Sequence, residues 1–256
     1  MSVIIGSSLI WNKLKCSDRY IREEKNIHKC LEQIGKAYLS QGITVYDINI
    51  DYNFCNILWV RDMFINIDNK ILICKCTKKS TENMDRSNEY HIIKKIFPKS
   101  IICPYKLEGG DIIEDENIFF CGIGIRTNYS GSKFIKKYTK KKIINIKHSA
   151  LHLDCCFMVL DNIVFYSKKY INKLPEYIHN NYKIILLEDL ISDTNLSTNI
   201  IKIKNTILIS DNYKFYKFRK YLKYLGYNLI EINTDTLMSL GGSIRCASQW
   251  LNRPKS

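Results

Sequence analysis

Four short stretches of the chain carry side chains that could act together on a flat, positively charged substrate. They supply a thiol, a histidine and several carboxylates: Cys246 in GGSIRC, His152 and Asp154 in LHLD, Glu108 and Asp111 in LEGGD, and Asp62 in WVRD. Carboxylates hold a guanidinium group through paired hydrogen bonds. A thiolate can attack the electron-poor central carbon of that group, and a histidine can pass a proton to the departing amine. The combination predicts covalent catalysis on a guanidinium-like cation.

Each of these residues, taken alone, has a simpler interpretation. A single histidine on a strand is more often a core residue than a catalyst, and any one cysteine among ten is usually inert. Gly-Gly-Asp is typical of a turn, and an Arg-Asp pair is typical of a surface. His152 and Asp154 are two residues apart, so on a strand they would share one face, where burial requires partners for both. Only the combination, at corresponding positions in successive repeats, favours a site.

The elements that must position these residues form a repeat. Four times a β-rich run meets a short turn containing asparagine and continues into another β-rich run, with turn residues Asn69, Asn117, Asn162 and Asn205. Asparagine tolerates left-handed backbone, so these runs predict hairpins, and stretches with helical spacing lie between them. Spacings of 48, 45 and 43 residues favour a closed, propeller-like α/β array over an α/β sandwich. A fifth unit could combine the LGGSIRC strand with the N-terminal SVIIGSSLI.

The composition limits the class of protein. No Pro-, Gly- or Ser-rich linker divides the 256 residues, so we expect a single domain over residues 1–256. No apolar run reaches the roughly 18 residues that a membrane-spanning helix needs. The first residues lack the basic region and the cleavage site of a signal peptide. These features predict a cytoplasmic protein that does not enter a membrane.

The ten cysteines predict neither a disulfide framework nor a metal site. The chain has no C-x-x-C pair; Cys74 and Cys76 are separated by one residue, and Cys155 and Cys156 are adjacent. Neighbouring residues on a strand point to opposite faces, so the adjacent pair could not easily share one metal ion. We therefore expect no metal and no cofactor, and we expect most thiols to fill the core.

The formal net charge of +14 raises nucleic acid as an alternative partner. The lysines, however, are scattered along the chain, and the densest run, residues 136–142, is expected to be a solvated helix end. We therefore expect no nucleic-acid partner, and expect a small molecule instead.

The motifs N-x-x-W-x-R-D, L-E-G-G-D, G-I-R-T-N, H-L-D and G-G-S-I-R-C follow each other from Asn56 to Cys246. In order and spacing they resemble the guanidino-group-modifying enzymes of the pentein superfamily. These include arginine deiminases, dimethylarginine dimethylaminohydrolases, agmatine deiminases and amidinotransferases. The resemblance implies an α/β fold, a five-bladed propeller of ββαβ-type units, and a Cys-His-Glu/Asp catalytic centre that needs no metal. It also leaves room for a homodimer, because many relatives pair.

The resemblance implies a role for each matching residue in catalysis. Cys246 resembles the nucleophile and His152 the general acid and base. Glu108 resembles the carboxylate that contacts both the histidine and the substrate; it would orient His152 and favour its protonated form. Asp62 and Asp154 resemble the pair that grips the terminal nitrogens of the guanidinium.

Four further positions resemble substrate-binding residues. Arg126, in GIRTN, is similar to the arginine that binds a substrate α-carboxylate, and Arg86 resembles its helper. Asn56 and Trp59 match the residues that line the substrate pocket in arginine deiminases. Asp111 is expected to be structural within its turn.

The sequence leaves two reactions open, and a third interpretation beside them. An acid at Asp154 suits an unsubstituted guanidinium, and Glu108 and the short chain favour a hydrolase that converts arginine or a close derivative to citrulline plus ammonia or an amine. The flanks RDMFINIDNKI, HLDCCFMVLDNIVFYS and SLGGSIRC resemble amidinotransferases, which pass the amidino group of arginine to an amine such as glycine. The third interpretation, a scaffold that only binds a ribosome or nucleic acid, is disfavoured because the catalytic set is present.

Overall fold

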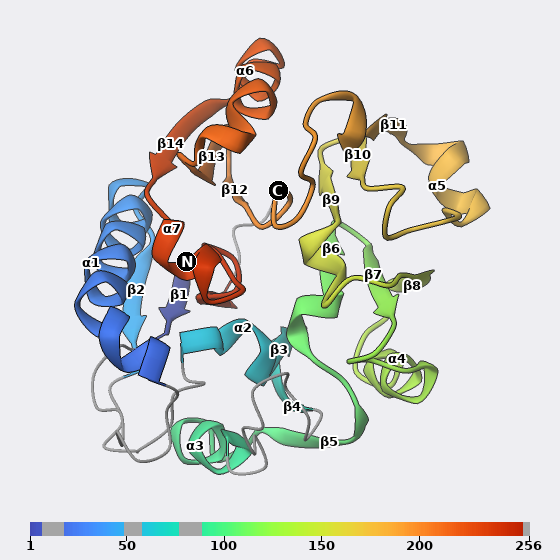
Figure 1. The fold of residues 1–256 in the computed structure, drawn as a ribbon. Helices are drawn as coiled ribbons and strands as arrows, with labels where there is room; N and C mark the ends of the chain where they lie inside the picture. Colours follow the sequence, from blue (N-terminus) through green and yellow to red (C-terminus); the bar gives the residue numbers. More distant parts are fainter. Residues whose placement is uncertain (7–17, 49–57, 77–88, 253–256) are drawn as a thin grey trace.

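Five small sheets form the structure, a computed structural model that describes residues 1–6, 18–48, 58–76 and 89–252. Each sheet has three strands, and the five stand like blades around a central axis, with the crossover helix of each blade on the outside (Figure 1). Within a blade, the first two strands pair antiparallel and the third pairs parallel with the second. A parallel neighbour requires a crossover, which a helix supplies. The predicted five-bladed propeller of ββαβ units is confirmed.

Four blades follow one another along the chain, each as a hairpin, a helix and a third strand. The first two contain β3 (Phe64–Ile67), β4 (Lys70–Lys75), α3 (Glu89–Ile96) and β5 (Ile101–Lys106), then β6 (Ile112–Asp115), β7 (Ile118–Ile123), α4 (Tyr129–Lys136) and β8 (Lys142–Lys147). The next two contain β9 (Phe157–Leu160), β10 (Ile163–Tyr166), α5 (Glu176–Asn181) and β11 (Lys183–Leu186), then β12 (Ile201–Ile203), β13 (Thr206–Ser210), α6 (Tyr216–Tyr224) and β14 (Asn228–Ile232). Two one-turn helices, η4 (Leu187–Asp189) and η5 (Tyr213–Phe215), lie in the connections.

The fifth blade closes the ring by joining the two ends of the chain. Strand β15 (Ser248–Asn252) pairs antiparallel with β1 (Ser2–Ile5), and β1 pairs parallel with β2 (Thr44–Asp47) across α1 (Asp18–Ser40). The prediction that the two ends of the chain form a fifth unit is confirmed, but the predicted C-terminal strand is wrong. The LGGSIRC segment is not a strand: it follows α7 (Asp235–Ser239) as a turn, and the strand begins at Ser248.

The hairpin turns repeat as predicted, although the asparagines are not always the left-handed residues. Positive φ angles occur at 48° and 64° in the first turn and at 31°, 52° and 52° in the others, at Asp68, Asn69, Glu116, Asp161 and Lys204. In the last three turns the residue before the asparagine is left-handed. The asparagine carbonyl instead accepts the N–H of the first residue of the third strand, in the pairs Lys142–Asn117, Lys183–Asn162 and Asn228–Asn205.

The hydrophobic core is divided among the gaps between neighbouring blades. The described residues contain five buried apolar clusters, and each one joins two adjacent blades. One cluster, for example, packs α1 and Val3 of the closing blade against Ile203 and Ile232 of the preceding blade. Six of the described cysteines lie buried in these clusters: Cys30, Cys74, Cys103, Cys121, Cys155 and Cys156. Because the apolar side chains pack between neighbouring blades, the ends of the strands near the axis are left for polar groups.

Within the described chain, no helix combines the length and the apolar character needed to cross a lipid bilayer.

Candidate active site

The candidate residues lie on short turns that lead into the first strand of each blade. These lead-in turns are α2 (Val60–Met63), η2 (Gly109–Asp111), η3 (Leu153–Cys155) and the turns at residues 195–198 and 244–247. Asp62, Glu108, His152, Asp154 and Cys246 all lie on or directly before them. The expectation that His152 and Asp154 occupy a strand is wrong. Both belong to a tight helical turn, in which His152 caps η3 and Asp154 lies inside it.

His152 is buried among carboxylates from two other lead-in turns. Its Nε2 lies 2.7 Å from Oε2 of Glu108 and 3.7 Å from Oδ1 of Asp62. Burial alone would lower the pKa of His152, but Asp62 and the hydrogen bond with Glu108 outweigh it and raise that pKa from 6.5 to about 10. The imidazole is therefore protonated at neutral pH and can act as an acid.

Glu108 links His152 to Arg126. Its Oε1 lies 3.3 Å from Nη1 of Arg126, whereas its Oε2 faces the imidazole, so one buried carboxylate serves two cationic groups. The backbone N–H of Glu108 donates to the hydroxyl of Thr127, 3.1 Å away. The GIRTN motif thus fixes both the backbone and the side chain of Glu108, and Arg126 lies beside the site.

Asp154 lies against two arginines that sequence reasoning did not single out. Its Oδ2 is 3.8 Å from Nε of Arg61 and 3.4 Å from Nε of Arg245. Burial raises the pKa of Asp154, while the two arginines oppose that rise. Arg61 also donates to Gln249 and to the carbonyl of Ile112, so it ties the acid to neighbouring blades. Both arginines stand next to expected site residues, in VRD and SIRC.

Cys246 sits in the last lead-in turn and contacts a residue that the sequence analysis missed. Its Sγ accepts a hydrogen bond from Nδ2 of Asn199 at 3.0 Å. Burial, Asp154 and Asp62 raise the pKa of the thiol well above its ordinary value of 9.0. The same two acids therefore lie within electrostatic reach of the sulfur, and Asp62 is also close to His152. The turn of Asn199 leads into β12. The position of Asn199 in the repeat was therefore the signal by which the sequence could have identified it.

Two glycines let these turns approach one another closely. A Cβ on Gly110 would lie 2.7 Å from Cγ of His152 and 2.9 Å from Oδ1 of Asp62. A Cβ on Gly242 would overlap the indole ring of Trp59. Because real Cβ atoms do not come so close, only glycine fits either position without movement. The Gly-Gly pair before Cys246 thus brings its turn against Trp59, which lies at the start of α2.

Asp111 joins the turns that carry Glu108 and His152. Its Oδ1 accepts the N–H of Leu153 at 2.8 Å and lies 3.0 Å from Nε2 of His148. Both side chains are fully buried. This placement agrees with the structural role expected for Asp111, and it adds His148, which sequence reasoning did not identify.

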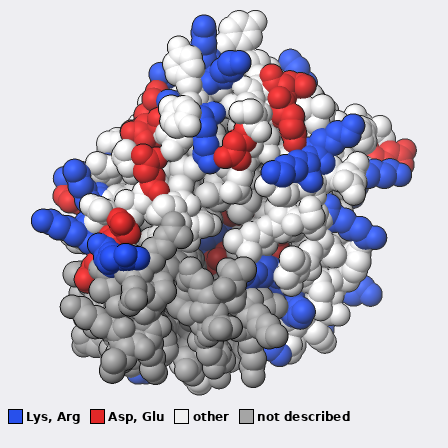
Figure 2. All heavy atoms as spheres, viewed as in Figure 1, with Lys and Arg blue, Asp and Glu red and all other residues white. Residues whose placement is uncertain are grey.

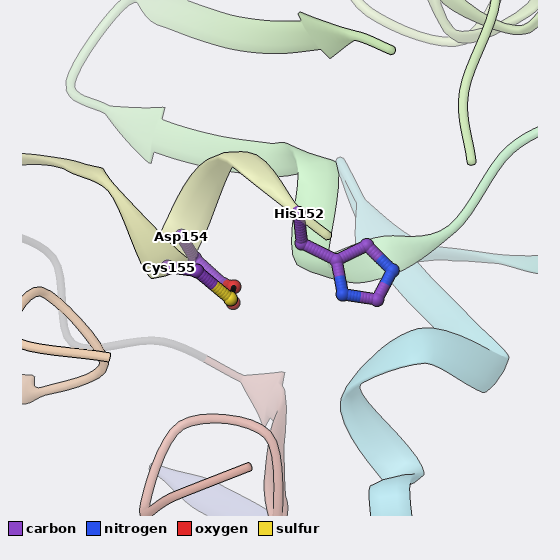
Figure 3. A group of neighbouring side chains, drawn as sticks. All are labelled: His152, Asp154 and Cys155. Carbon is purple, nitrogen blue, oxygen red and sulfur yellow. Dashed lines mark hydrogen bonds between the residues drawn. The ribbon is translucent and has the colours of Figure 1, made fainter. Parts of the chain in front are cut away.

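The centre of the ring is open to view from one face. Acidic side chains are visible in a hollow near the middle of the molecule, and lysines and arginines are spread over the surrounding surface (Figure 2). In the close-up, Asp154 and Cys155 project side by side from η3, and His152 extends from the start of that turn (Figure 3).

Two groups of side chains in the described part of the chain are close enough to hold a metal ion. His152, Asp154 and Cys155 form one group, and Asp62, Glu108 and His152 form the other, with ligand atoms within 4.8 Å of each other. In the first group, however, Asp154 already faces two guanidinium groups, and in both groups His152 is bound by Glu108. Both groups depend on His152, whose pKa is raised to about 10, and a metal ligand must be a neutral imidazole, so we assign no metal to either group.

Arg86 and Asn56 lie outside the described residues. Their expected roles in binding the substrate remain predictions.

Comparisons with known proteins place this geometry in context. No family model matches the chain. The uncharacterized protein YkgA of Bacillus subtilis (strain 168) is 26% identical over 251 residues, which cover 90% of this chain and 84% of YkgA. Among solved structures, SxtG, an amidinotransferase of saxitoxin biosynthesis from Microseira wollei, superposes with a TM-score of 0.79 at 15% identity and covers 100% of this chain and 95% of its own.

Two further structures show the same architecture. Dimethylarginine dimethylaminohydrolase from Pseudomonas aeruginosa gives a TM-score of 0.71 at 19% identity, with 97% and 98% of the two chains covered. The N-terminal domain of ArgZ, a cyanobacterial arginine dihydrolase, gives 0.82 at 14% identity, with 99% and 98% covered. This chain has the pentein fold. The resemblance predicted from the motifs is confirmed at that level.

Proposed function

We propose that this pentein modifies the guanidino group of arginine or a close derivative, through a covalent amidino intermediate on Cys246. The observation that carries the proposal is that Asp62 lies near both His152 and Cys246. This one acid lies 3.7 Å from His152 and acts electrostatically on the Cys246 thiol. It thereby connects a proton donor and a nucleophile that are far apart in sequence.

The charges around Cys246 suggest that binding of the substrate activates this thiol as the nucleophile. Without a substrate, Cys246 is a thiol, because burial and two acids raise its pKa. A guanidinium bound between Asp62 and Asp154 would neutralise these acids and favour the thiolate, with the thiol proton released to solvent.

The bond changes then follow in order. The sulfur bonds to the central carbon, and protonated His152 donates its proton to the departing nitrogen as the C–N bond breaks. Ammonia or an amine leaves, and an amidino group stays on Cys246. Neutral His152 next removes a proton from water, the resulting hydroxyl group bonds to the carbon, and the C–S bond breaks to give a ureido product.

We propose hydrolysis as the reaction. The solved relatives include a dimethylarginine dimethylaminohydrolase in complex with citrulline and an arginine dihydrolase. Arg126 beside Glu108 suits a substrate that carries an α-carboxylate, so arginine is preferred to agmatine, and Trp59 would line its pocket.

An amidinotransferase is the second candidate. SxtG, whose structure covers the whole chain, is described as an amidinotransferase, and the flanks of the motifs resemble that branch. The two reactions share the covalent step and differ only in whether water or an amine reaches the intermediate.

A substrate screen tests the proposal and separates the two reactions. Purified protein is incubated with arginine, monomethylarginine, dimethylarginine and agmatine, each with and without glycine. Citrulline formed from arginine without glycine supports hydrolysis. Ornithine and guanidinoacetate formed only when glycine is present identify a transferase. A folded protein that consumes none of these guanidines contradicts the proposal.

A further inference from the structure

Asn199 is a buried polar residue in contact with the sulfur of Cys246. Its side chain is almost fully buried, and its Nδ2 lies 3.0 Å from Sγ. A polar side chain is seldom buried without several partners, because lost contacts with water must be replaced. Asn199 has such partners in the sulfur of Cys246 and the backbone N–H groups of Arg245 and Cys246, which all belong to the turn that carries Cys246.

The orientation of the Asn199 amide is fixed by its oxygen. Oδ1 accepts the backbone N–H of Arg245 at 2.9 Å and that of Cys246 at 3.2 Å. A flipped amide would turn its NH₂ group toward these two donors and leave no acceptor for either. The oxygen must therefore face the backbone, and the NH₂ group must face the sulfur.

From this arrangement we propose that Asn199 is a catalytic residue that donates a hydrogen bond to the Cys246 thiolate. The inference rests on the proposed function, since it takes Cys246 as the nucleophile, and it deepens the account of how the sulfur becomes reactive. An N–H donor stabilises an anionic sulfur more than a neutral thiol, because hydrogen bonds to ionised groups are the stronger ones. The backbone of Ser243 acts on the thiol in the same direction.

The donor matters because the charges nearest the thiol oppose its ionisation. Asp154 and Asp62 both disfavour a negative sulfur, and Cys246 in turn raises the pKa of the neighbouring Cys155. The surrounding charged and titratable groups come from three lead-in turns: Arg61 and Asp62 on α2, His152, Asp154 and Cys155 at η3, and Arg245 beside Cys246 itself. A bound guanidinium would cancel the acids, and Asn199 would supply an uncharged donor that is in place before the substrate arrives.

The same contacts make Asn199 a bridge between blades. It leads into β12, whereas Cys246 leads into β15, which closes the ring. One amide therefore both positions the turn of the nucleophile and contacts its reacting atom. A structural role and a catalytic role must be separated by experiment.

Replacing Asn199 by aspartate makes that separation. In N199D one oxygen can still accept the two backbone N–H groups, while the other places negative charge beside the sulfur in place of the donor. We expect the pH at which Cys246 is half alkylated by iodoacetamide to rise by at least about one unit. We expect kcat for the guanidine found in the screen to fall about 10²–10³-fold, with a much smaller change in KM.

Two more variants keep the test decisive. N199A removes donor and acceptor together and should lose activity to a similar degree. N205D makes the same substitution on the β12–β13 hairpin turn, where the Asn205 side chain donates to the carbonyl of Gly226. This variant should behave like the unaltered protein. Melting temperatures identify any variant that is not folded.

The outcomes distinguish this inference from the proposed function. Alkylation of Cys246 needs no guanidine turnover, so its pH profile reports on Asn199 even if the substrate screen fails. A folded N199D protein whose alkylation profile matches that of the unaltered protein overturns the inference, whatever its stability. A profile shifted in both N199D and N199A, with N205D unchanged, supports it, because N199A removes the donor without adding a charge.

Discussion

The two ends of each blade show opposite kinds of variation. At the hairpin ends the chain repeats itself: four turns share an asparagine, and three of them share the same backbone hydrogen bond to the third strand. At the lead-in ends the five turns are all short, and η2 and η3 even share one backbone form, but each turn carries different polar side chains. Repetition of the backbone thus builds the ring, and the side chains that differ from one lead-in turn to the next carry the chemistry.

The environment of the charges differs in the same way. Glu108 at a lead-in end is fully buried against His152 and Arg126. Glu114, at the hairpin end of the same blade, pairs with Lys141, and both side chains remain about a quarter exposed. A buried pair loses much more when one partner is removed, because the other charge is left without compensation. Substitutions at the two ends should therefore have very different effects.

The largest effect is expected for C246S, which removes the nucleophile from its lead-in turn. Turnover of a guanidine substrate should fall by roughly three orders of magnitude or more, since a hydroxyl group cannot replace the thiolate here. The matched control is C155S, at the same distance before its strand in the turn of η3. A steady-state assay should show that C155S loses far less activity than C246S. Equal losses in both variants would mean that the ring has no single nucleophile.

The second largest effect is expected for E108Q, in which the pH dependence of the reaction rate should change. Glu108 helps to raise the pKa of His152 to about 10, so its loss should move the basic limb of the pH–rate profile toward neutral pH. Because that pKa is higher in the folded chain than the ordinary 6.5, protonated His152 stabilises the fold below pH 6.5. This stabilisation is lost as the pH rises through about 10. In E108Q it should be lost at a lower pH, because the pKa of His152 is lower there.

The control for E108Q is E114Q, which removes the partly exposed carboxylate that pairs with Lys141. Its pH–rate profile and its melting temperature as a function of pH should match those of the unaltered protein. A profile of E108Q that also matched would refute the link between Glu108 and His152.

D111N should have an intermediate effect. Its amide can no longer offer a charged acceptor to both Leu153 and His148, so the turn of His152 should loosen relative to that of Glu108. We expect about 1–3 kcal/mol less stability in urea unfolding and a roughly tenfold lower kcat. D68N, in an exposed hairpin turn, should leave both unchanged. Full activity in D111N would show that the lead-in turns hold their positions without this bridge.

The smallest effect is expected for K204G at a hairpin end. Lys204 has a φ of 52°, a left-handed value that glycine adopts without strain. The substitution should raise the free energy of unfolding by up to about 1 kcal/mol, and kcat should not change. A drop in kcat would contradict the separation of the two ends.

The hairpin ends could be read from the sequence, because period-two strands and turn asparagines leave a local pattern. The closing blade was harder, since β15 and β1 are at opposite ends of the chain. The strand bounds near Cys246 were wrong because the turn at residues 244–247 runs directly into β15 and, like the strand, mixes apolar with polar residues.

The candidate site was only partly readable. Asp62, Glu108, His152, Asp154 and Cys246 were identified by type and motif, and the structure places them on lead-in turns around one axis. Asn199, Arg61 and Arg245 were missed, because their partners are at least 46 residues away in sequence and no local periodicity marks a buried polar bridge. The three-residue helical turns η2 and η3 are too short to leave a helical pattern.

The most direct test of the central claim is to identify the cysteine that reacts with a haloacetamidine. This reagent carries a flat amidinium like that of a guanidine, and a thiol that attacks it releases halide and keeps the label. Brief treatment followed by peptide mass mapping should label Cys246 before the other nine cysteines, and arginine should protect it. Labelling spread over all ten cysteines, or labelling of Cys246 that arginine does not slow, would contradict the account.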